Sequence, residues 1–78
     1  MDYMKNAESC IERAINKYVE NGFSRKDAIY SIKRELAQLQ KPLNATGRVK
    51  EAIDYIQKAL NCTLDEALIK LKLMVIKL

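Results

Sequence analysis

The residue types that carry most protein chemistry are scarce in this sequence. It contains no His, and its two cysteines, Cys10 and Cys62, lie far apart and form no Cys-x-x-Cys pair. A nucleophilic Ser or Cys needs a base held against it, most often His, and a structural zinc site needs Cys and His ligands at close spacing. Gly22 and Gly47 stand alone, so the sequence has no glycine-rich phosphate-binding loop. We therefore expect no enzyme activity, no metal, no cofactor and no small-molecule substrate.

The cysteines and the absence of long apolar runs also indicate a compartment. We expect both cysteines to be structural free thiols in a reducing environment, because free Cys is among the most often buried residue types. The sequence has no run of about 18 apolar residues, and Asp2, Lys5 and Glu8 interrupt the start, where a signal peptide would need an apolar segment. These features predict a cytoplasmic protein without membrane contact.

The net charge of +4 is unevenly distributed along the chain. Residues 24–50 hold seven basic and two acidic side chains, which gives +5, whereas the remainder is nearly balanced. At roughly 100° per residue, five side chains of an expected second helix share one face away from its apolar stripe; they are Lys26, Tyr30, Lys33, Arg34 and Lys41. Cations around an exposed ring suit nucleic acid, an acidic protein surface, or simply a solvated helix face.

Helical periodicity and capping signals define the elements that carry these residues. Apolar residues recur three and four positions apart, and residues typical of helix ends divide the chain. The main signals are Asn21-Gly22, Ser24-x-x-Asp27, Pro42, Asn61 and the capping box Thr63-x-x-Glu66. We predict an all-α fold in a single domain over residues 1–78, with four helices that form two α-hairpins packed as a small helical bundle. The breaks should lie near residues 21–23, 41–46 and 61–62.

The expected fourth helix is apolar on two sides. Leu64, Leu68, Leu71, Val75 and Leu78 make one stripe, and Ile69, Leu73 and Ile76 make a second one nearly opposite. A surface helix of a small monomer needs only one apolar face. The helix is therefore the buried centre of the bundle, or its outer face meets a partner, or the segment is a strand that pairs across a dimer.

Of these three explanations we favour the second, in which the outer face of the fourth helix meets a partner. The sequence then describes a non-enzymatic protein–protein interaction module, a small regulator or inhibitor, that binds a protein target or forms a homodimer through Ile69, Leu73 and Ile76. The alternative is a nucleic-acid-binding protein that uses the basic second helix and the loop that follows it, as far as Lys50.

Overall fold

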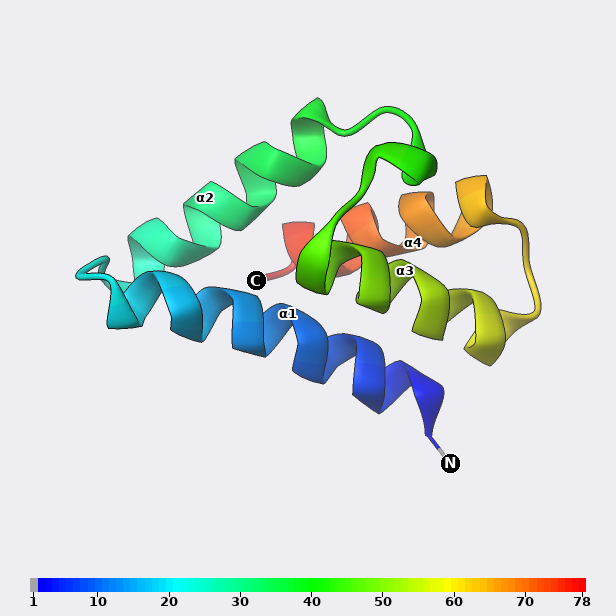
Figure 1. Ribbon diagram of the computed structural model, residues 1–78, viewed down its shortest axis with the longest axis horizontal. Helices are drawn as coiled ribbons and strands as arrows, with labels where there is room; N and C mark the ends of the chain where they lie inside the picture. The colour runs from blue at the N-terminus through cyan, green and yellow to red at the C-terminus, as the bar shows by residue number, and fades with distance from the viewer. Residues whose placement is uncertain (1) are drawn as a thin grey trace.

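The computed structural model describes residues 2–78, and this range forms four α-helices and one 3₁₀ turn (Figure 1). They are α1 (Tyr3–Glu20), α2 (Arg25–Gln38), the turn η1 (Pro42–Asn44), α3 (Gly47–Leu60) and α4 (Leu64–Ile76). Helices α1 and α2 form one hairpin and α3 and α4 the other; α1 packs along α3, and α4 contacts both α3 and α2. The predicted small all-α bundle is confirmed, and residues 2–78 contain no strand.

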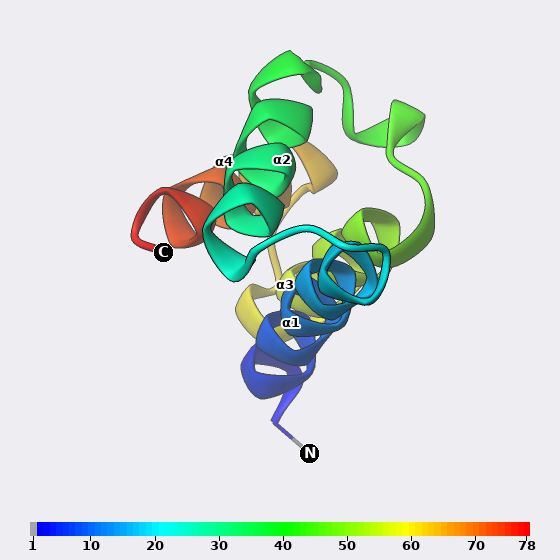
Figure 2. The same ribbon diagram turned by 90° about the vertical axis from the view of Figure 1, so that its left-hand side faces the viewer.

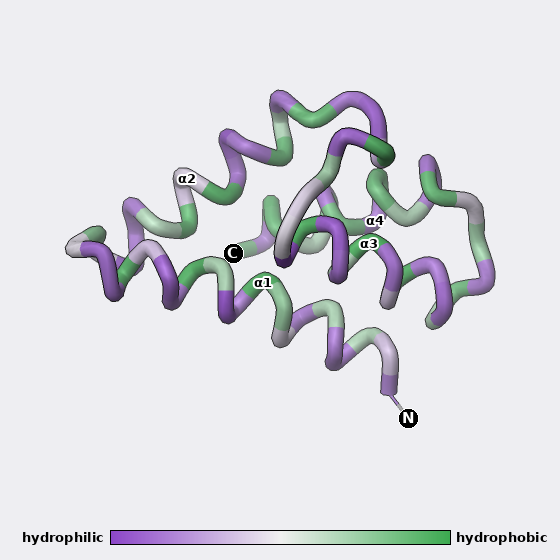
Figure 3. Tube along the Cα trace, in the orientation of Figure 1, coloured by the Kyte–Doolittle hydropathy of each residue, from purple (hydrophilic) through white to green (hydrophobic). Residues whose placement is uncertain are grey.

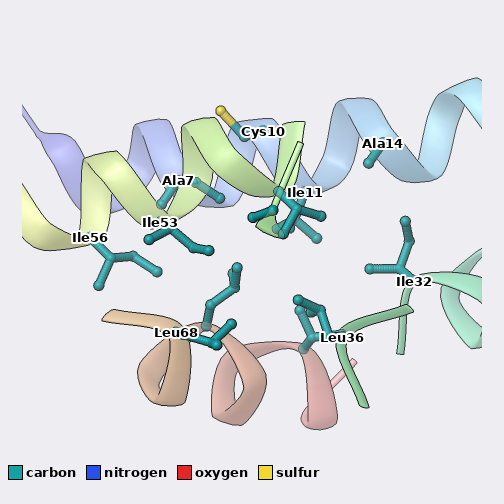
Figure 4. Close-up of a cluster of buried hydrophobic side chains, with 14 of the residues drawn as sticks. Ala7, Cys10, Ile11, Ala14, Ile32, Leu36, Ile53, Ile56 and Leu68 are labelled. Atoms are coloured by element: carbon teal, nitrogen blue, oxygen red, sulfur yellow. The ribbon is translucent and has the colours of Figure 1, made fainter. Parts of the chain in front are cut away.

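One apolar cluster joins the four helices. Figure 4 shows side chains from α1, α2, α3 and α4 meeting between the two hairpins. Along α1, hydrophobic and hydrophilic residues alternate at helical spacing, so that one side of the helix can be buried (Figure 3). Ala7 on α1 and Ala52 on α3 are fully buried. Buried alanines leave room for a neighbouring helix, because interaxial distance depends on the side chains at a helix contact.

The turn between α1 and α2 is built from local signals. The Phe23 N–H donates to the Tyr18 carbonyl (3.1 Å) and the Gly22 N–H to the Val19 carbonyl (3.0 Å), the pair of bonds that defines a Schellman motif. Gly22 has φ +99°, a conformation that side chains with a Cβ rarely adopt. The Phe23 ring then packs edge-on against Tyr18, with 5.2 Å between centroids. The chain is therefore turned sharply enough for α2 to fold back on α1.

Two helix ends differ in detail from the prediction. Helix α2 ends at Gln38, earlier than expected, because Leu39 is already extended (φ −82°, ψ 109°) and half-buried against the core. At the start of α4, the Thr63 hydroxyl accepts from the Glu66 N–H (3.2 Å), as expected for a cap. In a full capping box the Glu66 carboxylate would accept from the backbone N–H of Thr63. Here it accepts from the Thr63 hydroxyl instead (3.0 Å), so the second bond joins two side chains.

Candidate functional site

Helix α4 is buried on one side and open on the other. Its inward side chains pack against α3, α2 and η1, and they are Ala67, Leu68, Leu71 and Val75. The three residues of the second stripe point outward: Ile69 is 60% exposed, Leu73 52% and Ile76 66%. The helix is therefore neither the buried centre of the bundle nor a strand. We call Ile69, Leu73 and Ile76 the outward row.

The ends of the inward stripe differ from the prediction. Leu64 is only half-buried at the edge of the core, and Leu78 lies beyond the last helical residue, where it is exposed. Leu78 instead lines a hollow of about 370 Å³ between α1 and the end of α4, together with Ile11 and Met74. Ala67 is fully buried on the inward side of α4. The sequence analysis did not place it there, because a single alanine adds little to an apolar pattern.

The expected basic face on α2 is only partly formed as predicted. Lys26, Tyr30 and Arg34 are exposed, and Lys33 is half-buried. Lys41 does not belong to this face, because α2 ends at Gln38 and Lys41 lies in the extended link before η1. The face also does not point directly away from the core, because Lys33 lies at the contact between α2 and α4.

A small hollow at this contact brings the two predicted features together. It measures about 90 Å³, and Lys33, Leu36 and Ala37 of α2 line one side and Lys72, Val75 and Ile76 of α4 the other. Figure 2 shows α4 beside α2, with the C-terminal end of α4 at the periphery of the molecule. Ile76 of the outward row therefore borders the basic side of α2. Sequence reasoning treated these as separate surfaces, and no signal within either helix indicates that they adjoin.

The charges around the hollow are of one sign. The ion pairs formed within residues 2–78 are Arg25 with Glu12, bidentate at 2.6 and 3.1 Å, and Arg48 with Glu51 at 3.0 Å. Both arginines belong to the basic segment 24–50, so its free positive charge is smaller than its composition indicates. Neither pair includes a cation of the hollow. From residue 69 to residue 78 the chain has no acidic side chain, and it has three basic ones, Lys70, Lys72 and Lys77.

The buried thiol of Cys10 lacks the surroundings of a nucleophile. Its Sγ lies 3.7 Å from the Glu51 carboxylate, and burial, followed by this neighbouring negative charge, raises the pKa of the Cys10 thiol. Both cysteines are free, and Cys62 is half-buried between α3 and α4. Within residues 2–78 no three Cys, Asp or Glu side chains come together as a metal site requires.

Comparisons with protein-family models, with curated proteins and with solved structures find no match to this chain. No helix among residues 2–78 combines the length and apolar character needed to cross a bilayer.

Proposed function

We propose that this chain is a non-enzymatic protein–protein interaction module that docks through the outward row of α4. One observation carries the proposal: Ile69, Leu73 and Ile76 are each more than half exposed on one side of one helix. A single exposed aliphatic side chain is ordinary, whereas three on one side of a helix form a small apolar patch that a partner can extend by covering its borders. Each such side chain gains roughly 1.5–3 kcal/mol when it is fully buried, which favours a covered state.

A module of this kind acts by occupying or recruiting its target, so a small regulator or inhibitor is the role that fits. The two free cysteines, one in α1 and one in the link between α3 and α4, favour a reducing compartment such as the cytoplasm. A second copy of the chain is one candidate occupant of the row, since closed two-fold dimers are the commonest assemblies.

Site-specific photocrosslinking in the native host tests the docking surface. A benzophenone amino acid at position 73 should form adducts with a protein, and the same group at position 19 should not. Val19 is the matched control because it is an aliphatic residue that is 41% exposed in the last turn of α1, about two turns beyond the part of α1 that borders α4. Equal crosslinking from both positions, or none from position 73, would contradict docking through α4.

Nucleic-acid binding is a second candidate function, favoured by the exposed Tyr30 ring between Lys26 and Arg34 on α2. Stacking on a base and contacts to phosphates would then provide the affinity, which should fall steeply with salt. We expect the double substitution Lys33→Glu with Arg34→Glu to leave the fold intact and to abolish such binding. A parent chain with no affinity for DNA or RNA oligonucleotides at low salt would exclude this function.

A further inference from the structure

The outward row of α4 is too small to hold a partner alone. A fully exposed Leu or Ile offers roughly 60–120 Å² of apolar surface, so the three side chains together expose on the order of 100–200 Å². A stable interface buries about 800 Å² on each partner. A partner of α4 must therefore also cover the surface that borders the row.

That border is basic on the side of α2, where Lys33 of α2 and Lys72 of α4 line the hollow beside Ile76. On the side of α1 the border is mixed, because Lys77 lines a hollow together with Glu8 and Glu12. The acidic residues of α4 are confined to its first turn, where Glu66 is bound to the Thr63 hydroxyl. A second copy that covered both the row and the α2 border would bring like charges together, which disfavours it as the occupant.

The hollow itself is suited to one side chain of a partner. Its volume of about 90 Å³ has room for a single side chain. Leu36, Ala37 and Val75 provide apolar walls, and Lys33 and Lys72 complete the lining. Phosphates or nucleotide bases would gain little from aliphatic walls. A Leu, Ile or Met with a carboxylate nearby in the same segment matches both features.

We propose that the surface formed by α2 and α4 binds an acidic amphipathic helix of another protein. One aliphatic side chain of that helix enters the hollow, its neighbours cover the outward row, and its Asp or Glu side chains pair with Lys33 and Lys72. Helix-in-groove recognition of this kind uses apolar anchors at spacings of three and four residues. The inference rests on the proposed function and adds the chemistry of the partner to it.

A displayed peptide library tests the charge of the partner directly. The library would contain helical peptides with Leu, Ile or Met at positions i, i+4, i+7 and i+11, and with each flanking position varied among Glu, Lys and Gln. Selection on the full chain should enrich peptides whose flanks carry Glu. The variant with Lys33→Glu and Lys72→Glu should weaken these peptides by about tenfold or more and should select Lys-flanked peptides instead, because like charges across an interface repel.

Two control variants separate the possible outcomes. Lys5→Glu with Lys50→Glu makes the same charge change at exposed lysines of α1 and α3 and should retain the acidic preference. Leu73→Lys, with folding verified by circular dichroism, should lose the selected peptides. Peptides that depend on Leu73 but carry no acidic bias would overturn this inference and leave docking through α4 intact. If the selected peptides still bind the Leu73→Lys variant, or if no peptide is enriched, both the acidic-helix inference and docking through α4 are overturned.

Two further measurements test whether a second copy of the chain or a nucleic acid covers this surface instead. Sedimentation of the parent should show a monomer; a dimer that Leu73→Lys dissociates would mean that a second copy covers the row, and would overturn the inference. A single-stranded RNA or duplex DNA oligonucleotide should not displace the selected peptides at physiological salt. Displacement that Lys33→Glu with Lys72→Glu abolishes would assign the surface to nucleic acid instead.

Discussion

Two leucines on opposite sides of α4 should respond very differently to truncation. Leu71 is fully buried, whereas Leu73 is 52% exposed. Leu71→Ala leaves a cavity in the core and should lower the free energy of unfolding by about 2–5 kcal/mol. Leu73→Ala removes a side chain that keeps about half of its surface in water, so its cost should be about 1 kcal/mol or less. Both changes replace Leu by Ala in the same helix, so helix propensity contributes equally and the difference reports packing.

Urea denaturation followed by circular dichroism measures both costs, provided that the slope with urea stays the same in the three proteins. Equal costs would show that Leu73 is buried in solution. Repeating the titration at a tenfold higher protein concentration identifies the cause, because stabilisation by self-association depends on concentration. A large cost for Leu73→Ala that does not change with concentration would place the outward row inside the fold and refute the docking surface.

Three further predictions concern the thiols, the first turn and pH. Cys62 should react with a maleimide well before Cys10 in the folded chain at about pH 8, because burial raises the pKa of the Cys10 thiol, and urea should equalise the two rates. Gly22→Ala should cost about 1–2 kcal/mol, since φ is +99° there, and should lower the thermal midpoint. The hydrogen bond from Arg25 lowers the pKa of Glu12, so this pair stabilises the fold at neutral pH and is lost as pH falls below about 4.5. Glu12→Gln should therefore show a smaller loss of stability between pH 7 and pH 3 than the parent does, as measured by thermal unfolding.

Much of the fold is predictable from the sequence because the signals that end its helices are local. Asn21-Gly22 forms the expected turn, Ser24 and Thr63 cap the helices that follow them, and Asn61 ends α3 in the left-handed conformation with φ 50°. Each of these signals acts through a backbone group within a few residues, so no knowledge of the rest of the chain is needed.

Predictions that depend on tertiary contacts are less accurate. Sequence reasoning ends α2 near Pro42, which restricts Lys41, but the helix ends at Gln38 because the half-buried Leu39 packs against the core in an extended conformation. This difference removes Lys41 from the predicted basic face. The 3₁₀ turn at Pro42–Asn44 also depends on tertiary contacts, since it contacts α4, and no periodicity in the short loop predicted at residues 41–46 indicates that contact.

The candidate site shows where periodicity stops being informative. The spacing of Ile69, Leu73 and Ile76 places them on one side of a helix, and the same holds for Lys26 and Lys33 on α2. It says nothing about which side of one helix meets which side of another, and the adjacency of Lys33 and Ile76 depends on how α2 and α4 pack.

The adjacency of Lys33 and Ile76 changes what the surface can recognise. Exposed cations alone bind weakly and are screened beyond about 8 Å at physiological salt, and the apolar row alone is too small for a stable interface. Together, on the proposed function, the row provides burial while the lysines orient the partner and exclude basic competitors.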